Sequence, residues 1–488
     1  MPTEGQTRFF DAFAIALSQA CEGGEKRWYT STIELQLGSL DICRACRSTP
    51  TLRVRVTGGT PTSLWSPPSV QALPNTQSSK IGVSSRVPVV RALHLTRALS
   101  METLVQRAAI ELWARSERLE MMGPLCAASL GSVVWPLGLT QLVLDTDFHI
   151  PMESLSFPVL LQNLSFGDYF NQPIAGVVWP ASMKQLSFGA TFNQRIAGVV
   201  WPASMKQLSF GYEFDQPIAQ VVWPASLLQL SFGDYFDQPI AQVVWPASLI
   251  QLSFGSDFNQ PIAQVVWPAP LLRLSFGYEF NQPIAEVVWP ASLLQLSFGA
   301  RFNHPIAEVA WPASLQQLSF GDDYNQPIAE VVWPASLIQL SFGDDFNQPI
   351  GEVVWPASLQ QLWFGDDFNQ PIGEVVWPAF LQQLSLGSEF DQPIAGVVFP
   401  ARLEKLYFGN RFNQDIAGVV WPASLIQLSF GDDFNQPLAE VLWPASLKQL
   451  LLGPRFKQSI AGIAWPRSMR RVARGGLTLP WHHGHTFG

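Results

Sequence analysis

The chain has 488 residues, of which 47% are hydrophobic and only 14% are charged, so the composition excludes a largely disordered polypeptide. No run of 18 or more apolar residues is present, and the sequence therefore predicts no membrane-spanning helix. Residues 1–118 hold 14 Lys and Arg against 9 Asp and Glu, whereas residues 119–468 hold 12 against 29. Such an acidic body argues against nucleic acid or anionic lipid as the main partner.

Residues 1–57 form an N-terminal region whose fold the sequence does not define. Apolar residues between 9 and 17 recur at helical spacing, and apolar and polar residues alternate over 33–37 and 52–56, as expected of strands. These pieces are too short and too few to predict an independent domain.

The next three segments lead into the body of the chain. Residues 58–87 are rich in Pro, Ser and Gly and are predicted to form a flexible linker. A short helical segment is expected within 88–117. Residues 118–138 resemble a degenerate copy of the unit that follows them, and we expect them to cap its N-terminal end.

Only four cysteines occur, Cys21, Cys43, Cys46 and Cys126. Such low use favours a reducing compartment, and we expect a cytoplasmic protein. Cys43 and Cys46 have the spacing of half a zinc site, but no second pair completes it, so no metal site is predicted.

A 22-residue repeat dominates the rest of the chain. Tryptophan recurs at this interval from 179 to 377 and again from 421 to 465, and Phe399 holds the register between them. Fifteen units fill residues 139–468 without insertion or deletion, and residues 469–488 form a C-terminal cap with a basic, histidine-containing tail. About seven apolar side chains, worth roughly 1.5–3 kcal/mol each when buried, cannot offset roughly 1–2 kcal/mol of backbone entropy per residue within one unit. The units must therefore stack on one another as a solenoid.

Residues 337–358, "LIQLSFGDDFNQPIGEVVWPAS", illustrate the unit. Leu340 and Phe342 alternate with a serine, as in a short strand with one face inward. A glycine then permits a turn, Phe346 points back to the core, and a proline bars a regular helix. Trp355 ends an apolar run before the next proline. The unit therefore predicts a strand, a turn and an irregular return segment.

The motifs "LSFG" and "FNQPI" in this unit resemble the FNIP repeat, a 22-residue relative of the leucine-rich repeat. The resemblance covers roughly residues 118–475. It implies a mainly β solenoid with a parallel strand ladder, and protein interaction rather than catalysis. Arg195 and Asp415 replace the motif's proline, and Lys457 replaces its asparagine. Some members carry an F-box before the repeats, but this sequence shows no convincing F-box pattern.

Two columns of side chains are assigned structural roles. Asn325, Asn347 and Asn369 belong to an asparagine column that is expected to bond the backbone of neighbouring coils. Aspartate can accept but not donate, so the coils in which it replaces asparagine are expected to be slightly looser; these positions are 215, 237 and 391. The tryptophan column either fills the core or forms exposed platforms that stack on sugars, and the replacement by Phe399 favours the core.

The acidic turns are one candidate interaction surface. Asp344, Asp345, Asp366 and Asp367 follow the strands of two neighbouring units, so stacking brings like charges into columns. Such columns attract cations or a basic partner, although a solvated, solubilising face is the simpler interpretation.

The strand face offers a second candidate. Its outward residue is serine in most units, but Trp363 and Tyr407 break the pattern and are the candidate contact residues. Near-identity of the other units is equally expected from recent duplication without a specialised ligand.

No nucleophile, base and orienting group recur together, and we predict no catalytic residue and no cofactor. His482, His483 and His485 could hold a transition metal, but a frayed end explains them more simply. The resulting hypothesis is a non-enzymatic scaffold that binds other proteins, with an oligomeric state that the sequence does not set. The alternatives are a carbohydrate-binding repeat protein and an adaptor with an N-terminal recruiting region.

Overall fold

A computed structural model describes residues 32–37, 52–58, 90–95, 118–122, 135–145, 152, 155–475 and 477–478. The chain divides into two compact units, the first ending at Leu227 and the second beginning at Leu228, apart from residues 217–219, which belong to the second. The cysteines, the tail histidines and residues 59–87 of the linker predicted at 58–87 lie outside the described residues, while Gly58 ends a strand.

The first unit begins with strands β1 (Thr32–Leu37), β2 (Leu52–Gly58), β3 (Val90–Leu95) and β4 (Arg118–Met122). β1 and β2 are antiparallel and include the two alternating segments expected there, while β3 pairs parallel with β1 and with β4. β3 lies within the segment 88–117 where a short helix was expected, and residues 100–116 lie outside the described residues.

The rest of the first unit is a parallel ladder of β4, β5 (Gln141–Asp145), β6 (Asn163–Phe166), β7 (Gln185–Ser187) and β8 (Gln207–Ser209). Leu164 pairs with Leu186, and Leu186 with Leu208, so the register follows the 22-residue repeat. The strand of the degenerate copy also joins the ladder. Leu119 pairs with Leu142, so these partners are one residue further apart in the sequence than the partners of the 22-residue repeat.

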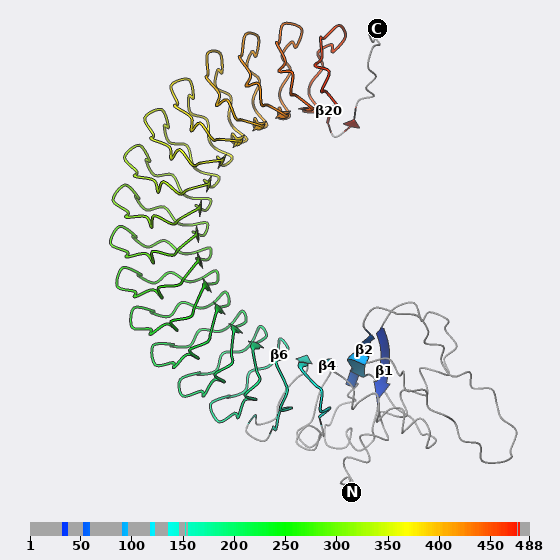
Figure 1. The fold of residues 1–488 in the computed structure, drawn as a ribbon, viewed down its shortest axis with the longest axis vertical. Coiled ribbons are helices and arrows are strands. Elements are labelled where there is room, and N and C mark those ends of the chain that lie inside the picture. Colours follow the sequence, from blue (N-terminus) through cyan, green and yellow to red (C-terminus); the bar gives the residue numbers. More distant parts are fainter. Residues whose placement is uncertain are drawn as a thin grey trace, which may run out of the picture. The chain divides into compact units, whose positions relative to one another are not determined.

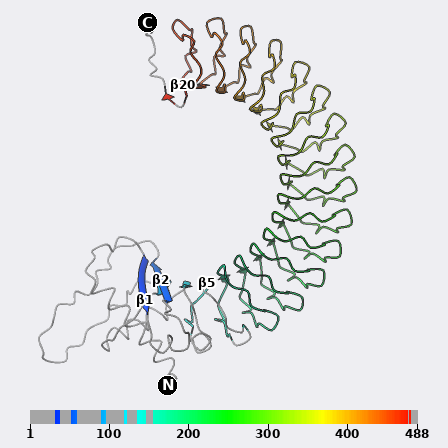
Figure 2. The same ribbon diagram turned by 180° about the vertical axis from the view of Figure 1, so that it is seen from behind.

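The second unit is a solenoid built from the same element (Figure 1). Its strands are β9 (Gln229–Ser231), β10 (Gln251–Ser253), β11 (Arg273–Ser275), β12 (Gln295–Ser297), β13 (Gln317–Ser319), β14 (Gln339–Ser341), β15 (Gln361–Trp363), β16 (Gln383–Ser385), β17 (Lys405–Tyr407), β18 (Gln427–Ser429), β19 (Gln449–Leu452), β20 (Arg471–Arg474) and β21 (Leu477–Thr478). From β9 to β20 every pair is parallel with partners 22 residues apart, and β21 turns back antiparallel to β20. The coils of this unit fan so that their strands lie on the inner side, as Figure 2 also shows. The mainly β solenoid with short strands is thus confirmed.

Apolar columns fill the interior of each coil. Leu340 and Phe346 are fully buried and Phe342 is nearly so. The ring of Phe342 stacks on that of Phe364 in the next coil at 5.6 Å between centroids, and Phe346 stacks on Phe368 at 6.2 Å. Because most rings lie against the equivalent ring of the next coil, and Leu386 and Leu452 take the place of a ring in two coils, each coil forms much of the core of its neighbours.

Backbone hydrogen bonds fix the turns between coils. The N–H of Asp345 donates to the carbonyl of Asp322 at 2.8 Å, and the N–H of Asp367 donates to that of Asp344 at 2.7 Å. The glycine before each of these turns lies directly against the glycine of the preceding coil. A Cβ atom built on Gly343 would stand 1.9 Å from the carbonyl oxygen of Gly321, where no side chain fits.

One coil places a tyrosine in the phenylalanine column. The ring of Tyr324 is fully buried and stacks on Phe302 at 6.0 Å and on Phe346 at 6.1 Å. Its hydroxyl has no hydrogen-bond partner among the described residues, and burial raises the pKa of Tyr324 well above its ordinary value. The hydroxyl therefore loses its hydration on folding and gains nothing in return.

In the part of the chain that the structure describes, no helix is long and apolar enough to cross a membrane.

We expect Gly343→Ala to lower the free energy of unfolding by about 1–3 kcal/mol or more, because the new methyl group overlaps the backbone of the preceding coil. The matched change is Gly373→Ala, at a position where a Cβ atom meets nothing within 4 Å. It should be neutral or stabilise the chain by about 0.4–1 kcal/mol through the unfolded state. Urea denaturation of the two variants checks the difference, and equal stabilities would contradict the glycine contact.

Tyr324→Phe should raise the free energy of unfolding by about 1–2 kcal/mol, because it removes an unsatisfied buried hydroxyl and keeps the ring. Tyr278→Phe serves as the control, since Tyr278 is half exposed and should tolerate the change. Urea denaturation monitored by circular dichroism measures both. A destabilised Tyr324→Phe variant would show that the hydroxyl does have a partner.

Candidate interaction surface

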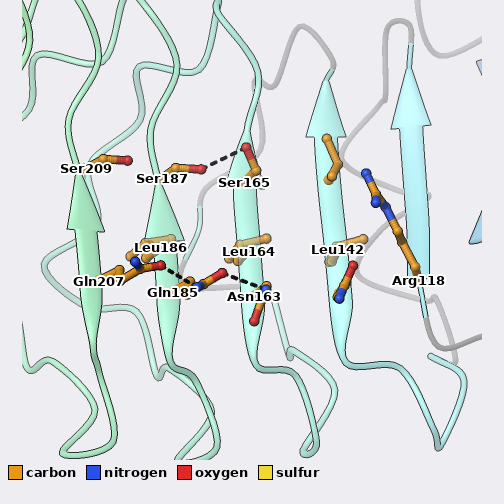
Figure 3. A pocket seen from close by; sticks show the side chains of 12 residues that line it. Arg118, Leu142, Asn163, Leu164, Ser165, Gln185, Leu186, Ser187, Gln207 and Ser209 are labelled. Atoms are coloured by element: carbon orange, nitrogen blue, oxygen red, sulfur yellow. Dashed lines mark hydrogen bonds between the residues drawn. The ribbon is translucent and has the colours of Figure 1, made fainter. Parts of the chain in front are cut away.

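The outward face of the strand ladder carries two rows of neutral polar side chains. In the first unit, Nδ2 of Asn163 donates to Oε1 of Gln185 at 2.7 Å, and the amide of Gln185 donates to that of Gln207 (Figure 3). Two residues further along the strands, Oγ of Ser187 donates to Oγ of Ser165 at 2.9 Å. These rows line a shallow groove of about 280 Å³ across β4 to β8.

The second unit has a comparable groove of about 230 Å³ across β12, β13 and β14. Glutamine and serine side chains line it, and Nε2 of Gln339 donates to Oε1 of Gln361 at 2.5 Å. At the next strand the groove meets the indole of Trp363, which belongs to its lining. The serine row is therefore unbroken from β6 to β14, and Trp363 on β15 is the first large side chain to replace it.

The structure places both predicted contact residues in the serine row. Trp363 pairs with Ser341 on one side and Ser385 on the other, and Tyr407 follows two strands later, paired with Ser385 and Ser429. Both rings are half-buried, and partial burial raises the pKa of Tyr407. Neither ring enters the core, so both are available on the face.

The acidic turns lie just beyond the carboxyl ends of the same strands. Asp344, Asp345, Asp366 and Asp367 are all exposed. The pKa of Asp344 is raised first by desolvation and then by the charges of Asp366 and Asp322, and the pKa of Asp345 is raised in the same way. Stacking therefore brings like charges together, as the sequence predicts.

Arginines compensate the acidic turns only in other coils. Arg301 pairs with Glu279 at 3.1 Å, Arg411 pairs with Glu389 at 2.7 Å, and Arg455 pairs with an aspartate of the preceding coil. Among the described residues, the six aspartates between 322 and 367 have no ion-pair partner. This stretch of turns thus presents uncompensated negative charge to solvent.

The asparagine column bonds neighbouring coils through its side-chain oxygen. Oδ1 of Asn347 accepts from the backbone N–H of Asn369 at 3.0 Å and from Nε2 of Gln370 at 2.9 Å, and Oδ1 of Asn325 accepts in turn from the N–H of Asn347. Oδ1 of Asp237 accepts the equivalent bonds at 2.9 Å. Because these contacts use the oxygen and not the amide nitrogen, they do not support the looser aspartate coils that we expected.

The tryptophan column lies inside the coils. Trp355 is 7% exposed, stacks on Trp333 at 6.4 Å, and meets Phe364 edge-on. Its indole N–H is buried without a hydrogen-bond partner among the described residues, so the role of this ring is to fill space in the core. Phe399 fills the same position in its own coil. A carbohydrate site built on this column therefore has no structural support.

Sequence reasoning missed two exposed features. In the apolar run before each tryptophan, Val353 is buried but Val354 is 79% exposed, and equivalent valines form an exposed row. Successive side chains of an extended segment point to opposite faces, and this alternation could have shown that Val353 is buried and Val354 exposed. Phe380 is also exposed, and the guanidinium of Arg402 from the next coil lies 4.4 Å from its ring centroid.

The parallel ladder, the 22-residue register and the inward leucines define a solenoid of the leucine-rich-repeat kind. The FNIP Repeat family matches residues 148–454 in overlapping windows that follow the repeat, and the chain belongs to this family.

One solved structure supports the fold, and a second shows a weaker similarity. CroV588, described as a circular leucine-rich-repeat protein, is 39% identical over 74% of this chain with a TM-score of 0.64, and the match covers 55% of the CroV588 chain. An internalin from Listeria monocytogenes is 14% identical over 64% of this chain and 91% of its own, with a TM-score of 0.44. No curated protein matches the chain.

Asn347→Ala should lower the free energy of unfolding by about 1–3 kcal/mol, because it leaves the N–H of Asn369 without its acceptor and leaves Nε2 of Gln370 only the backbone carbonyl of residue 347. Asn347→Asp keeps the acceptor and should retain most of that stability. Urea denaturation of both variants measures the difference. Equal losses would mean that the amide nitrogen also contributes.

Proposed function

We propose that the chain is a non-enzymatic scaffold that binds other proteins through the outward face of strands β14 to β19 and the acidic turns beside it. The observation that supports this most directly is the replacement of serine by Trp363 and Tyr407 in a row that carries serine on every strand from β6 to β14. Large aromatic side chains at the centre of an otherwise polar face are typical of contact hot spots.

The charge of the surface favours a partner with a basic patch. The aspartates at 344, 345, 366 and 367 follow β14 and β15, on the side of the surface that carries Trp363, and their like charges repel one another and attract cations. The same acidity disfavours nucleic acid as a ligand. Low cysteine use favours a cytoplasmic location for such a scaffold.

An affinity-capture experiment with the full-length chain tests this function. One variant combines Trp363→Ser and Tyr407→Ser with charge reversal to lysine at the four aspartates. The matched control reverses four exposed carboxylates on the return segments, Glu330, Glu352, Glu374 and Glu440. We expect the first variant to lose captured proteins by roughly tenfold or more, as hot-spot removal does, and the control to keep them. Identical capture by both would contradict the proposed surface.

A further inference from the structure

Large and small side chains alternate across five neighbouring strands of the second unit. The register aligns Trp363, Ser385, Tyr407, Ser429 and Leu451 in one row on β15 to β19. We call the three large residues the ridges and the spaces above the two serines the slots. In contrast, every strand from β12 to β14 carries serine at this position, so the alternation begins at β15.

The spacing of the ridges follows from the ladder. Neighbouring strands lie about 4.8 Å apart, so ridges on alternate strands are about 9.6 Å apart. The coils converge toward the strand face: Trp333 and Trp355 are 6.4 Å apart at the outer corner, whereas Phe342 and Phe364 are 5.6 Å apart beneath the strands. Side chains that project beyond the strands are therefore brought slightly closer than the strands themselves.

This spacing matches one type of extended backbone. A polyproline II helix rises about 3.1 Å per residue with three residues per turn, so equivalent side chains recur about every 9.3 Å. An extended β-strand repeats about every 6.7 Å, and an α-helical turn advances about 5.4 Å. A polyproline II segment lying across the strands can thus set one residue in each slot without a change of register.

The chemistry of the face suits the same backbone. A polyproline II helix has no internal hydrogen bonds, so its carbonyl groups need external donors. Gln383 and Gln427 stand two residues before the slot serines, and Lys405 stands two residues before Tyr407. Aromatic ridges that hold proline rings are the usual way in which proteins bind such segments.

Charge complementarity sets the composition of the ligand. Asp366 and Asp367 follow Trp363 by three and four residues and are exposed, and they continue the uncompensated acidic turns from 322 onward. The next acid, Glu389, is neutralised by Arg411. A ligand that reaches Trp363 therefore meets negative charge on the turn side of β15, where lysine or arginine would fit.

We propose that the ridges on β15 to β19 bind a proline-rich segment of a partner protein in the polyproline II conformation, with a basic residue at the end that lies beside Asp366 and Asp367. This inference rests on the proposed function and names the chemistry of its partner.

The test uses the full-length chain and synthetic peptides measured by calorimetry. The probe is a peptide with Pro-Pro-Arg repeated three times, and the comparison peptide has Gly-Gly-Arg repeated three times, which keeps the charge without the stiff backbone. We expect the proline peptide to bind the parent chain roughly tenfold or more tightly than the glycine peptide. Equal affinities would mean that the peptides are bound through their charge alone and would overturn the proposal. The proposal would also be overturned if neither peptide bound.

Three variants locate the site. Trp363→Ser and Tyr407→Ser restore the residue found in most coils, so they should fold normally, and each should weaken binding of the proline peptide roughly tenfold. Ser385→Trp fills a slot and should abolish binding. Tyr278→Ser, which removes an exposed ring from a turn elsewhere, is the matched control and should leave affinity unchanged. Unchanged binding by the three ridge and slot variants would overturn the proposal.

Two further outcomes distinguish a failure of this inference from a failure of the proposed scaffold function. If the proline peptide fails to bind while the combined variant of the capture experiment still loses captured proteins, the inference is overturned and the scaffold function stands. If the combined variant loses no proteins either, both proposals are overturned. If the parent chain binds cellohexaose and the Trp363→Ser variant does not, the ligand is a polysaccharide and the proposal of a protein ligand is overturned.

Discussion

The fold depends on the contact between one coil and the next. Leu340, Phe342 and Phe346 are buried mainly because the equivalent residues of the adjoining coils cover them, and the backbone bonds of each turn are made to the turn before it. A 22-residue coil on its own has neither a closed core nor satisfied turn groups. Stability is therefore a property of the stack, and every other feature of the surface is placed by its register.

Much of this architecture could be predicted from the sequence, because a strict period converts directly into geometry. Once Leu340 and Phe342 are assigned to a strand, the absence of insertions requires the next strand to lie beside it in register. The same reasoning placed Trp363 and Tyr407 on the outward row and the aspartates of neighbouring coils in columns. The N-terminal pieces lack such a period, so the sequence predicts only isolated elements there, of which the two alternating segments near 33 and 52 form β1 and β2.

Other features depend on distances that a repeat motif does not contain. The sequence shows an amide at position 347 but not which of its atoms meets the next coil, and the oxygen alone accounts for the bonds observed. Likewise, the run Val353, Val354, Trp355 is uniformly apolar, yet its middle residue faces water because the chain is extended there. The alternation of large and small residues from β15 to β19 can be read as a ligand spacing only after the strand order and register show that the ridges stand on every second strand.

The regular ladder also constrains how such a surface can change. Because each strand adds one fixed increment, the separation between Trp363 and Tyr407 can be altered only in whole steps, by adding or removing coils between them. Duplication of a coil would thus act as a discrete adjustment that changes which ligand periods are compatible, while leaving every side chain and turn as it was.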